Sequence, residues 1–220
     1  MSAGLFFDIL DDKRRNILPL FAPLKGRFYL AGGTGLALQI GHRDSIDFYF
    51  FTIGSFEPKK LQEELGAILS GHELMTIQQE RDTLTMVVDK SIKISYFGYP
   101  YPLVRPMLDA DALILASVED IGCMKLTAVV GRATLKDCID LYFIVRQFSL
   151  TALLDLANQK YPSFNSALAL KSLTYFDDIV DEPILFKHGA DVSLDDVSFY
   201  LKQQVKKVCD SGLVWRRRRS

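Results

Sequence analysis

A glycine turn and one acidic residue, both between residues 28 and 52, could do chemistry together. Gly32 and Gly33 separate a β-rich run from the helical pattern that begins at Thr34, and such a turn presents backbone N–H groups to anions such as phosphate. Asp47 follows among aromatic residues, where a carboxylate is costly to bury unless it meets a cation or hydrogen-bond donors. A glycine turn, then a helix, then a strand that bears an acid is the arrangement that brings a triphosphate and a divalent ion together for phosphoryl transfer. The residue types alone leave a purely structural role of the turn and the acid equally open.

The surrounding patterns predict the elements that must position these residues. Runs rich in β-branched and aromatic residues predict strands at 27–31, 45–51, 74–80, 83–88 and 91–97, and helical patterns begin at Thr34 and Pro58. After the proline-rich segment 99–106 and a short apolar run, the patterns are helical only. We therefore predict an α/β (α+β) core over residues 1–115, built on a mixed sheet with helices, and an all-α domain over residues 116–220.

The segment from Phe28 to Thr52, FYLAGGTGLALQIGHRDSIDFYFFT, closely resembles the AbiEii/AbiGii-type toxin family, which has a nucleotidyltransferase fold. Members of that family show a GGTALAL-like helix start, then GHR-x-S-x-D-x-D before an aromatic pair. The matching positions are Gly32–Leu38, Gly41-His42-Arg43, Ser45, Asp47 and Tyr49. The resemblance implies that Gly32, Gly33 and Thr34 cradle the phosphates of a nucleoside triphosphate. It also implies that Arg43 neutralises these phosphates and that Asp47 holds the metal ion.

A second block also resembles this family, in which a lysine-bearing helix precedes an arginine turn and a helix that starts with a basic–acidic pair and D-L-Y. The matching residues are Glu119-Asp120, Lys125, Gly131-Arg132, Lys136-Asp137 and Asp140-Leu141-Tyr142. Lys125 lies on the apolar stripe of its own helix, and an inward lysine usually meets a charge. It could form a salt bridge with Asp137 or Asp140, contact phosphate or base as a catalytic residue, or do both, with the two acids orienting it.

The chain departs from the family pattern at two metal-binding positions. Complete sites pair two acids one residue apart, because the period of two in a strand aims both side chains at the same ions. Here Tyr49 occupies the second position and Ser95 the third, whereas Ser45 shares the face without adding charge. A neutral phenol is a poor ligand for a hard dication. Asp47 alone could still fix one Mg²⁺ (or Mn²⁺) ion on a bound nucleotide.

The resemblance implies two alternative functions. The chain could transfer a nucleotidyl group from a triphosphate to RNA or protein, as a toxin of a toxin–antitoxin or phage-defence pair with an antitoxin partner. Alternatively, it could be a non-catalytic module that binds nucleotide, RNA or a partner protein. Tyr49 and Ser95 favour the second function, and the intact glycine turn and Lys125 favour the first.

Composition limits the remaining possibilities. No apolar run is long enough to cross a membrane, and the three cysteines are widely spaced, which indicates reduced thiols in a cytoplasmic protein. The net charge of −1 argues against a uniformly basic nucleic-acid binder. The terminal run Arg216–Arg219 is nevertheless a candidate contact to an RNA backbone.

Overall fold

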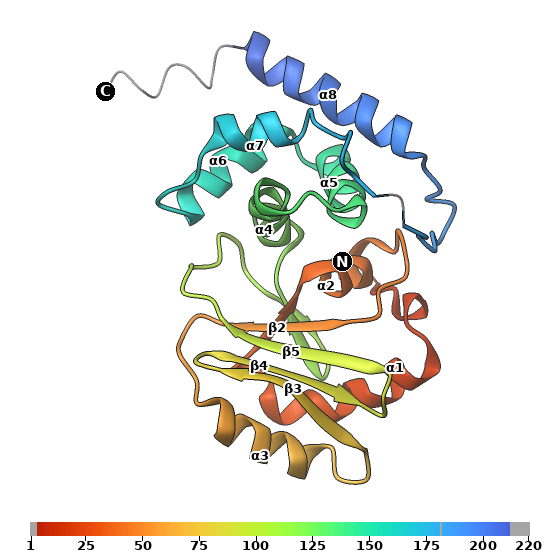
Figure 1. Cartoon of the computed structure of the whole chain (residues 1–220), viewed down its shortest axis with the longest axis vertical. Coiled ribbons are helices and arrows are strands. Elements are labelled where there is room, and N and C mark those ends of the chain that lie inside the picture. The colour runs from red at the N-terminus through yellow and green to blue at the C-terminus, as the bar shows by residue number, and fades with distance from the viewer. Residues whose placement is uncertain (1–3, 181, 212–220) are drawn as a thin grey trace. The chain divides into compact units, whose positions relative to one another are not determined.

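The structure is a computed structural model that describes residues 4–180 and 182–211 (Figure 1). The chain divides into two compact units, Met1–Ser117 and Val118–Ser220. We call these the sheet unit and the helical unit, and we describe each by itself. Arg216–Arg219, the candidate RNA contact, lies outside the described residues.

The sheet unit is built on a seven-stranded sheet with the order β3-β4-β5-β2-β1-β7-β6. Its strands are β1 (Tyr29–Ala31), β2 (Phe48–Thr52), β3 (Leu74–Glu80), β4 (Thr83–Val88), β5 (Ile92–Gly98), β6 (Leu108–Ala110) and β7 (Leu113–Leu115). β2 runs antiparallel to β1 and parallel to β5, and β1 runs parallel to β7. The predicted mixed sheet is therefore confirmed.

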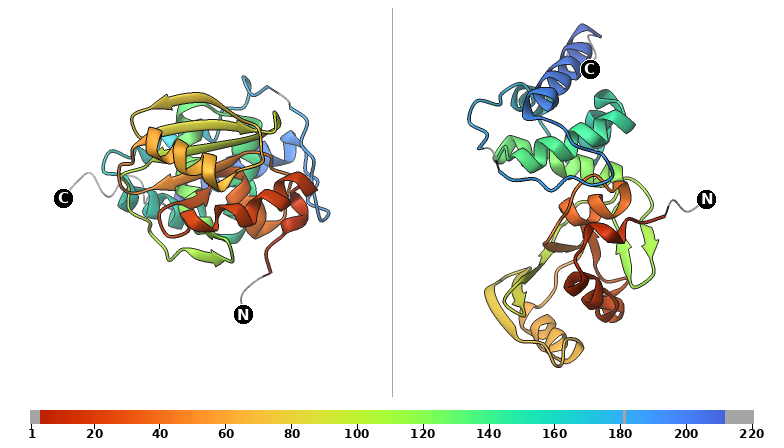
Figure 2. Two further views of the ribbon diagram at one scale, coloured as in Figure 1. Left: turned by 90° about the horizontal axis from the view of Figure 1, so that it is seen from below. Right: turned by 90° about the vertical axis from the view of Figure 1, so that its right-hand side faces the viewer.

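Helices precede and interrupt these strands. They are the 3-10 helices η1 (Phe7–Ile9) and η2 (Leu18–Leu24) and the α-helices α1 (Asp12–Ile17), α2 (Gly32–Ile40) and α3 (Pro58–Ile68). α3 begins with Pro58 at its first turn, and the Glu57 side chain accepts a hydrogen bond from the Lys59 backbone. Its buried residues Leu61 and Leu65 face the sheet, where α3 contacts β3 and β4 (Figure 2).

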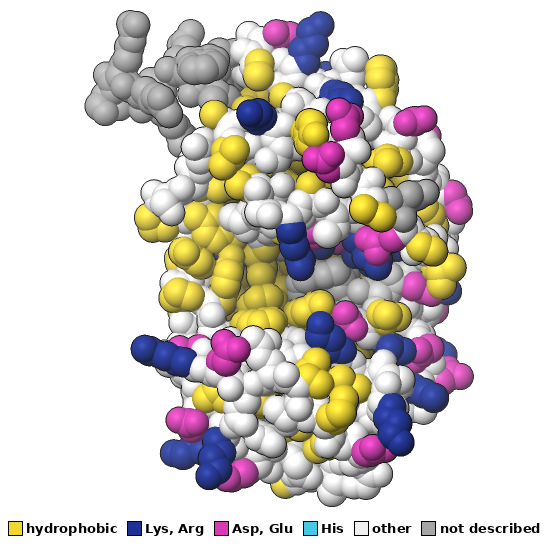
Figure 3. Space-filling view, viewed as in Figure 1, with side chains coloured by type: hydrophobic (Ala, Val, Ile, Leu, Met, Phe, Trp, Pro, Cys, Tyr) yellow, Lys and Arg dark blue, Asp and Glu magenta, His cyan; other side chains and the backbone are white. Residues whose placement is uncertain are grey.

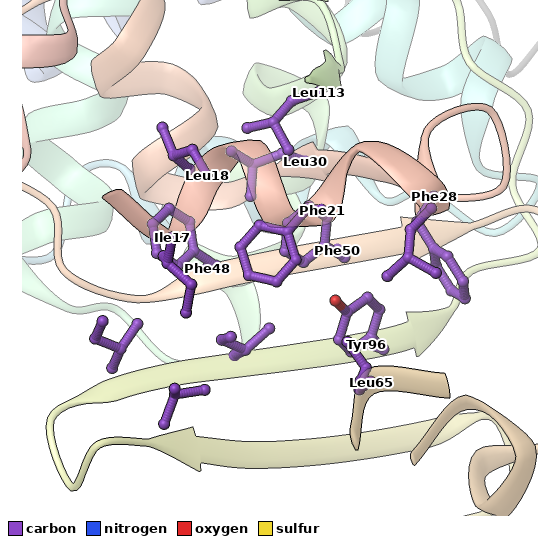
Figure 4. Packing of buried hydrophobic residues seen from close by; sticks show 14 of the residues in the cluster. Ile17, Leu18, Phe21, Phe28, Leu30, Phe48, Phe50, Leu65, Tyr96 and Leu113 are labelled. Carbon is purple, nitrogen blue, oxygen red and sulfur yellow. The ribbon is translucent and has the colours of Figure 1, made fainter. Parts of the chain in front are cut away.

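The main core lies on one face of this sheet. Alternate residues of β2 and β5 point into it, so that the rings of Phe50 and Tyr96 stack with centroids 5.0 Å apart. Phe21 from η2 packs against Phe50 at 5.2 Å (Figure 4). The opposite face of the sheet therefore carries the intervening residues, which include Tyr49 on β2 and Ser95 on β5.

The second strand differs from its prediction. We expected a strand over 45–51, which would place Asp47 inside it, but β2 begins at Phe48 and Asp47 immediately precedes it. The backbone carbonyl of Asp47 accepts a hydrogen bond from the Thr34 hydroxyl. A side chain of α2 thus satisfies a backbone group that a longer strand would have paired with another strand.

The helical unit contains α4 (Val118–Gly131), α5 (Leu135–Gln147), α6 (Leu150–Lys160), α7 (Ser166–Ser172) and α8 (Leu194–Asp210). Short polar side chains cap four of these helices, as Thr134 does for α5 and Ser149 for α6, by accepting a backbone hydrogen bond in the first turn. The predicted all-α character of this part is confirmed.

No helix within the described ranges combines the length and hydropathy that a bilayer crossing requires. On the face shown in Figure 3, acidic and basic side chains are interspersed.

Candidate functional site

The glycine turn brings the chain from β1 directly into α2. Gly32 has a φ of +66°, a conformation that L side chains rarely adopt, and a Cβ added there would lie 3.3 Å from Cδ2 of Tyr49. A Cβ added at Gly33 would lie 2.6 Å from Nη2 of Arg43. Glycine at both positions therefore allows the backbone to approach the neighbouring side chains closely. The first-turn N–H groups of a helix have no intrahelical acceptor, so this end of α2 suits an anion.

A hydrogen-bond chain joins this turn to Asp47. The side chain of Thr34 is fully buried at 0% exposure, and its hydroxyl donates to the backbone carbonyl of Asp47. The Thr34 oxygen also lies 2.7 Å from Oγ of Ser45. Because a hydroxyl has only one proton to donate, Ser45 is the donor in this second bond. The turn and the acid are thus held together by side chains of the matched segment.

The structure places Tyr49 beside Asp47 and Ser95 beside Tyr49. The Tyr49 hydroxyl donates to Oδ2 of Asp47 across 3.2 Å, and Tyr49 is the direct partner of Ser95 in the parallel register of β2 and β5. Ser95 is only 1% exposed and accepts a hydrogen bond of 3.2 Å from Thr85 on β4. The Tyr49 ring is fixed by stacking on Phe97, with 6.4 Å between centroids and an interplanar angle of 18°.

These donors fit one metal ion but not a pair. Asp47 is the carboxylate at this point, and its neighbours are a phenol and a hydroxyl, both neutral and both already hydrogen-bonded. Across residues 4–180 and 182–211, no three His, Cys, Asp or Glu side chains gather in a way that could hold a metal ion. A Mg²⁺ ion that arrives with triphosphate needs only one or two protein carboxylates, and Asp47 can supply one of them. A two-ion cluster would need more carboxylates than these residues provide.

Arg43 lies under the glycine turn. Its side chain is 3% exposed, its guanidinium packs against Gly33, and its Nη1 donates to the backbone carbonyl of Asp44 across 2.9 Å. The positive charge therefore lies next to the end of α2, where it adds to the attraction for an anion. Because the charge is buried, this attraction is screened less by salt than that of an exposed arginine.

Lys125 of the helical unit is held by both acids that the sequence associated with it. Its Nζ lies 2.8 Å from Oδ1 of Asp137 and 2.6 Å from Oδ2 of Asp140, and all three residues are buried. Thr134, the cap of α5, donates a further 2.8 Å hydrogen bond to Asp137. The salt bridges that we predicted are therefore present, and they fix the direction of the lysine side chain.

Two lysines were missed by the sequence reasoning. Lys160 on α6 and Asp120 on α4 form an ion pair of 2.8 Å in which both side chains are 0% exposed. Lys93 on β5 lies with its Nζ 6.0 Å from the centroid of the Tyr49 ring. The alternation of β5 was a usable signal, because Lys93 and Ser95 share the face that carries Tyr49.

Comparisons with known proteins show the family and the fold of the chain. The model of a family described as "Nucleotidyl transferase AbiEii toxin, Type IV TA system" matches residues 20–202. An uncharacterised protein of Aquifex aeolicus (strain VF5) is 33% identical over 190 residues, which cover 84% of this chain and 89% of that protein.

Solved structures share the fold at low sequence identity. The nucleotidyltransferase toxin MenT4 from Mycobacterium tuberculosis H37Rv superposes with a TM-score of 0.61 at 16% identity, covering 90% of this chain and 82% of that chain. JHP933 from Helicobacter pylori superposes with a TM-score of 0.57 at 15% identity, covering 97% of this chain and 96% of that chain. At these identities the likeness concerns the fold alone.

Proposed function

The chain belongs to the nucleotidyl transferase AbiEii toxin family, and from this premise we propose that it binds a nucleoside triphosphate with one Mg²⁺ ion and transfers the nucleotidyl group to RNA or protein. The observation that supports this proposal is the hydrogen bond from Thr34 to the backbone carbonyl of Asp47, which ties the N-terminal end of α2 to the residue whose carboxylate would hold the metal ion. A fixed arrangement of this kind favours transfer because phosphoryl chemistry depends mainly on positioning and charge.

Each residue has a role that its contacts support. The N–H groups of Gly32, Gly33 and Thr34 would bind phosphate oxygens, and the charge of Arg43 behind the turn would strengthen this binding. Asp47 would hold the Mg²⁺ ion, which when bound withdraws negative charge from the phosphates.

Several supporting side chains surround these groups. Ser45 completes the link to Asp47, Tyr49 restrains its carboxylate, and Ser95 fills the adjacent strand position. For Lys125 we retain the prediction of a contact to phosphate or base, with Asp137 and Asp140 fixing its direction.

The partners follow from the family. A family described as part of a type IV toxin–antitoxin system implies an antitoxin, and we propose RNA as the first acceptor to test. We further propose that the pair acts in the cytoplasm, in the manner of a phage-defence system.

A second function is supported by the composition of the site. With Tyr49 and Ser95 where further acids would bind a second ion, the chain could retain the fold and the nucleotide pocket as a binding module without transfer. Loss of one such electrostatic contact lowers rates in other enzymes by about 100-fold to 1,000-fold. The two functions therefore differ in the transfer step rather than in nucleotide binding.

A transfer assay separates them. The protein is incubated with each radiolabelled triphosphate, total tRNA and Mg²⁺ or Mn²⁺, in parallel with Asp47→Ala, Tyr49→Asp and the control Asp12→Asn, whose carboxylate is 84% exposed. Transfer that persists in the control and falls by about 100-fold or more in Asp47→Ala supports the enzyme. Transfer by Tyr49→Asp alone supports the binding module. If calorimetry detects no triphosphate binding by any variant, both functions are wrong.

A further inference from the structure

One basic side chain on the site face of the sheet has no role in the function proposed above. Lys93, Ser95 and Phe97 alternate along β5 on the face opposite the main core, and Tyr49 of β2 pairs with Ser95. The Nζ of Lys93 lies 6.0 Å from the centroid of the Tyr49 ring, and the hydroxyl of that ring donates to Oδ2 of Asp47 across 3.2 Å. The lysine and the carboxylate that would hold the metal ion therefore adjoin the same tyrosine.

The surroundings of the half-buried Lys93 differ from those of the two buried lysines in the helical unit. Lys125 and Lys160 each meet a carboxylate at 2.8 Å or less. Within the described residues, no carboxylate lies within ion-pair distance of Lys93, whose Nζ instead lies 6.0 Å from the centroid of the Tyr49 ring. A cation over an aromatic face is attracted to the ring but is not neutralised by it. Its charge thus remains available to an anion.

The charge balance of the site creates a need for such a cation. A triphosphate is strongly anionic, and a single Mg²⁺ ion bound by Asp47 would neutralise only part of its charge. The phenol of Tyr49 and the hydroxyl of Ser95 recruit none. Positive charge must then come from groups of the protein itself, and a flexible lysine is a common phosphate ligand.

We propose that Lys93 binds the phosphates of the bound nucleotide. Its positive charge on β5 would neutralise part of the negative charge of these phosphates, a role that a second divalent ion would otherwise have. This inference rests on the proposed function, because it takes a triphosphate as the ligand of the site. The Tyr49 ring has a defined part in it. The ring stacks on Phe97, its hydroxyl hydrogen-bonds to Asp47, and the ammonium group of Lys93 lies over its face.

Direct binding measurements test the inference without requiring catalysis. Isothermal titration calorimetry is performed with each of the four nucleoside triphosphates and with inorganic tripolyphosphate, in Mg²⁺ and in EDTA. The variants are Lys93→Met, Lys93→Gln and Lys93→Arg. Lys90→Met serves as the matched control, because Lys90 lies in the turn before β5 with 79% of its side chain exposed. A thermal unfolding curve of each variant verifies that the variant is folded. If Lys93→Met does not fold, Lys93→Gln takes its place.

The expected result is specific. Removal of the charge should weaken binding of tripolyphosphate and of the preferred nucleotide by about tenfold or more, with the larger loss in EDTA, where no metal ion compensates. Lys93→Arg should bind within about threefold of the natural protein, and Lys90→Met should not differ from it.

Four results would overturn the inference. If Lys93→Met binds as tightly as the natural protein, Lys93 is not a phosphate ligand, although the proposed function stands. If Lys90→Met loses as much affinity as Lys93→Met, the loss reflects the overall charge of the protein rather than a specific contact. If Lys93→Arg loses as much, the loss reflects the shape of the side chain rather than its charge. If the natural protein binds no triphosphate in either condition, the proposed function fails together with the inference.

Discussion

The hydroxyl of Thr34, in the first turn of α2, donates a hydrogen bond to the backbone carbonyl of Asp47. Ser45 extends this link, since its oxygen lies 2.7 Å from that of Thr34. One buried side chain thereby ties the backbone of the acid to the N-terminal end of the helix, which we propose binds anions. β2 begins at Phe48, so Asp47 lies outside the strand.

Replacement of Thr34 tests this link. Thr34→Val keeps the shape of the side chain but removes the donor, so the partly buried Asp47 carbonyl loses this hydrogen bond. We expect a loss of about 1–3 kcal/mol in the free energy of unfolding, measured by urea denaturation, and weaker triphosphate binding. Thr127→Val is the control, because the Thr127 hydroxyl bonds only to the Met124 carbonyl of its own helix. Equal losses in the two variants would show that the link is unimportant.

A second prediction concerns the close approach at the glycine turn. Gly33→Ala would place a methyl group 2.6 Å from Nη2 of the buried Arg43, which must move. We expect a destabilisation of about 1–3 kcal/mol and loss of phosphate binding. Gly66→Ala in α3 meets no atom within 4 Å and should instead stabilise the protein by about 0.8–1.0 kcal/mol. The prediction is wrong if both alanines raise the thermal midpoint.

The buried pair in the helical unit should respond strongly to single changes. Lys160→Met leaves the Asp120 carboxylate buried without its ammonium partner, so we expect a loss of about 3–5 kcal/mol in the free energy of unfolding. The double variant Asp120→Leu, Lys160→Met should cost less than the sum of the single changes, because no isolated charge remains. Lys136→Met, which removes the partly exposed pair with Glu182, should cost at most about 1 kcal/mol. Additive losses in the double variant would contradict this account.

Cysteine labelling provides a pH-dependent prediction. Burial, together with the neighbouring carboxylate of Asp137, raises the pKa of the Cys138 thiol to about 12. Because the thiolate is the reactive form, Cys138 should remain unlabelled by iodoacetamide at pH 8 and become reactive only as the pH nears this value or the protein unfolds. Cys123 is also buried, whereas Cys209 is exposed and should react in the native state.

Mass spectrometry after brief labelling locates the modified thiol. The variant Cys209→Ser should remove the native signal. Fast modification of Cys138 in folded protein would mean that α5 opens far more readily than its packing suggests.

The sequence by itself determined the features that depend on short spacing. A glycine pair between a strand and a helix, an acid ahead of aromatic residues, and the change to purely helical patterns after residue 115 are local patterns, and the mixed sheet with its helical continuation is present as predicted. The salt bridges of Lys125 with Asp137 and Asp140 could also be predicted from the sequence, because these residues lie on consecutive helices and Lys125 lies on the apolar stripe of its helix.

Only the tertiary structure decided the contacts between distant segments. The bond between Thr34 and Asp47, the pairing of Tyr49 with Ser95, the place of Lys93 and the ion pair of Lys160 with Asp120 depend on strand register and helix packing. Residue periodicity specifies which face of an element is buried but not which residue of another element it meets. That choice is made by the packing of the whole core, where many weak contacts act together.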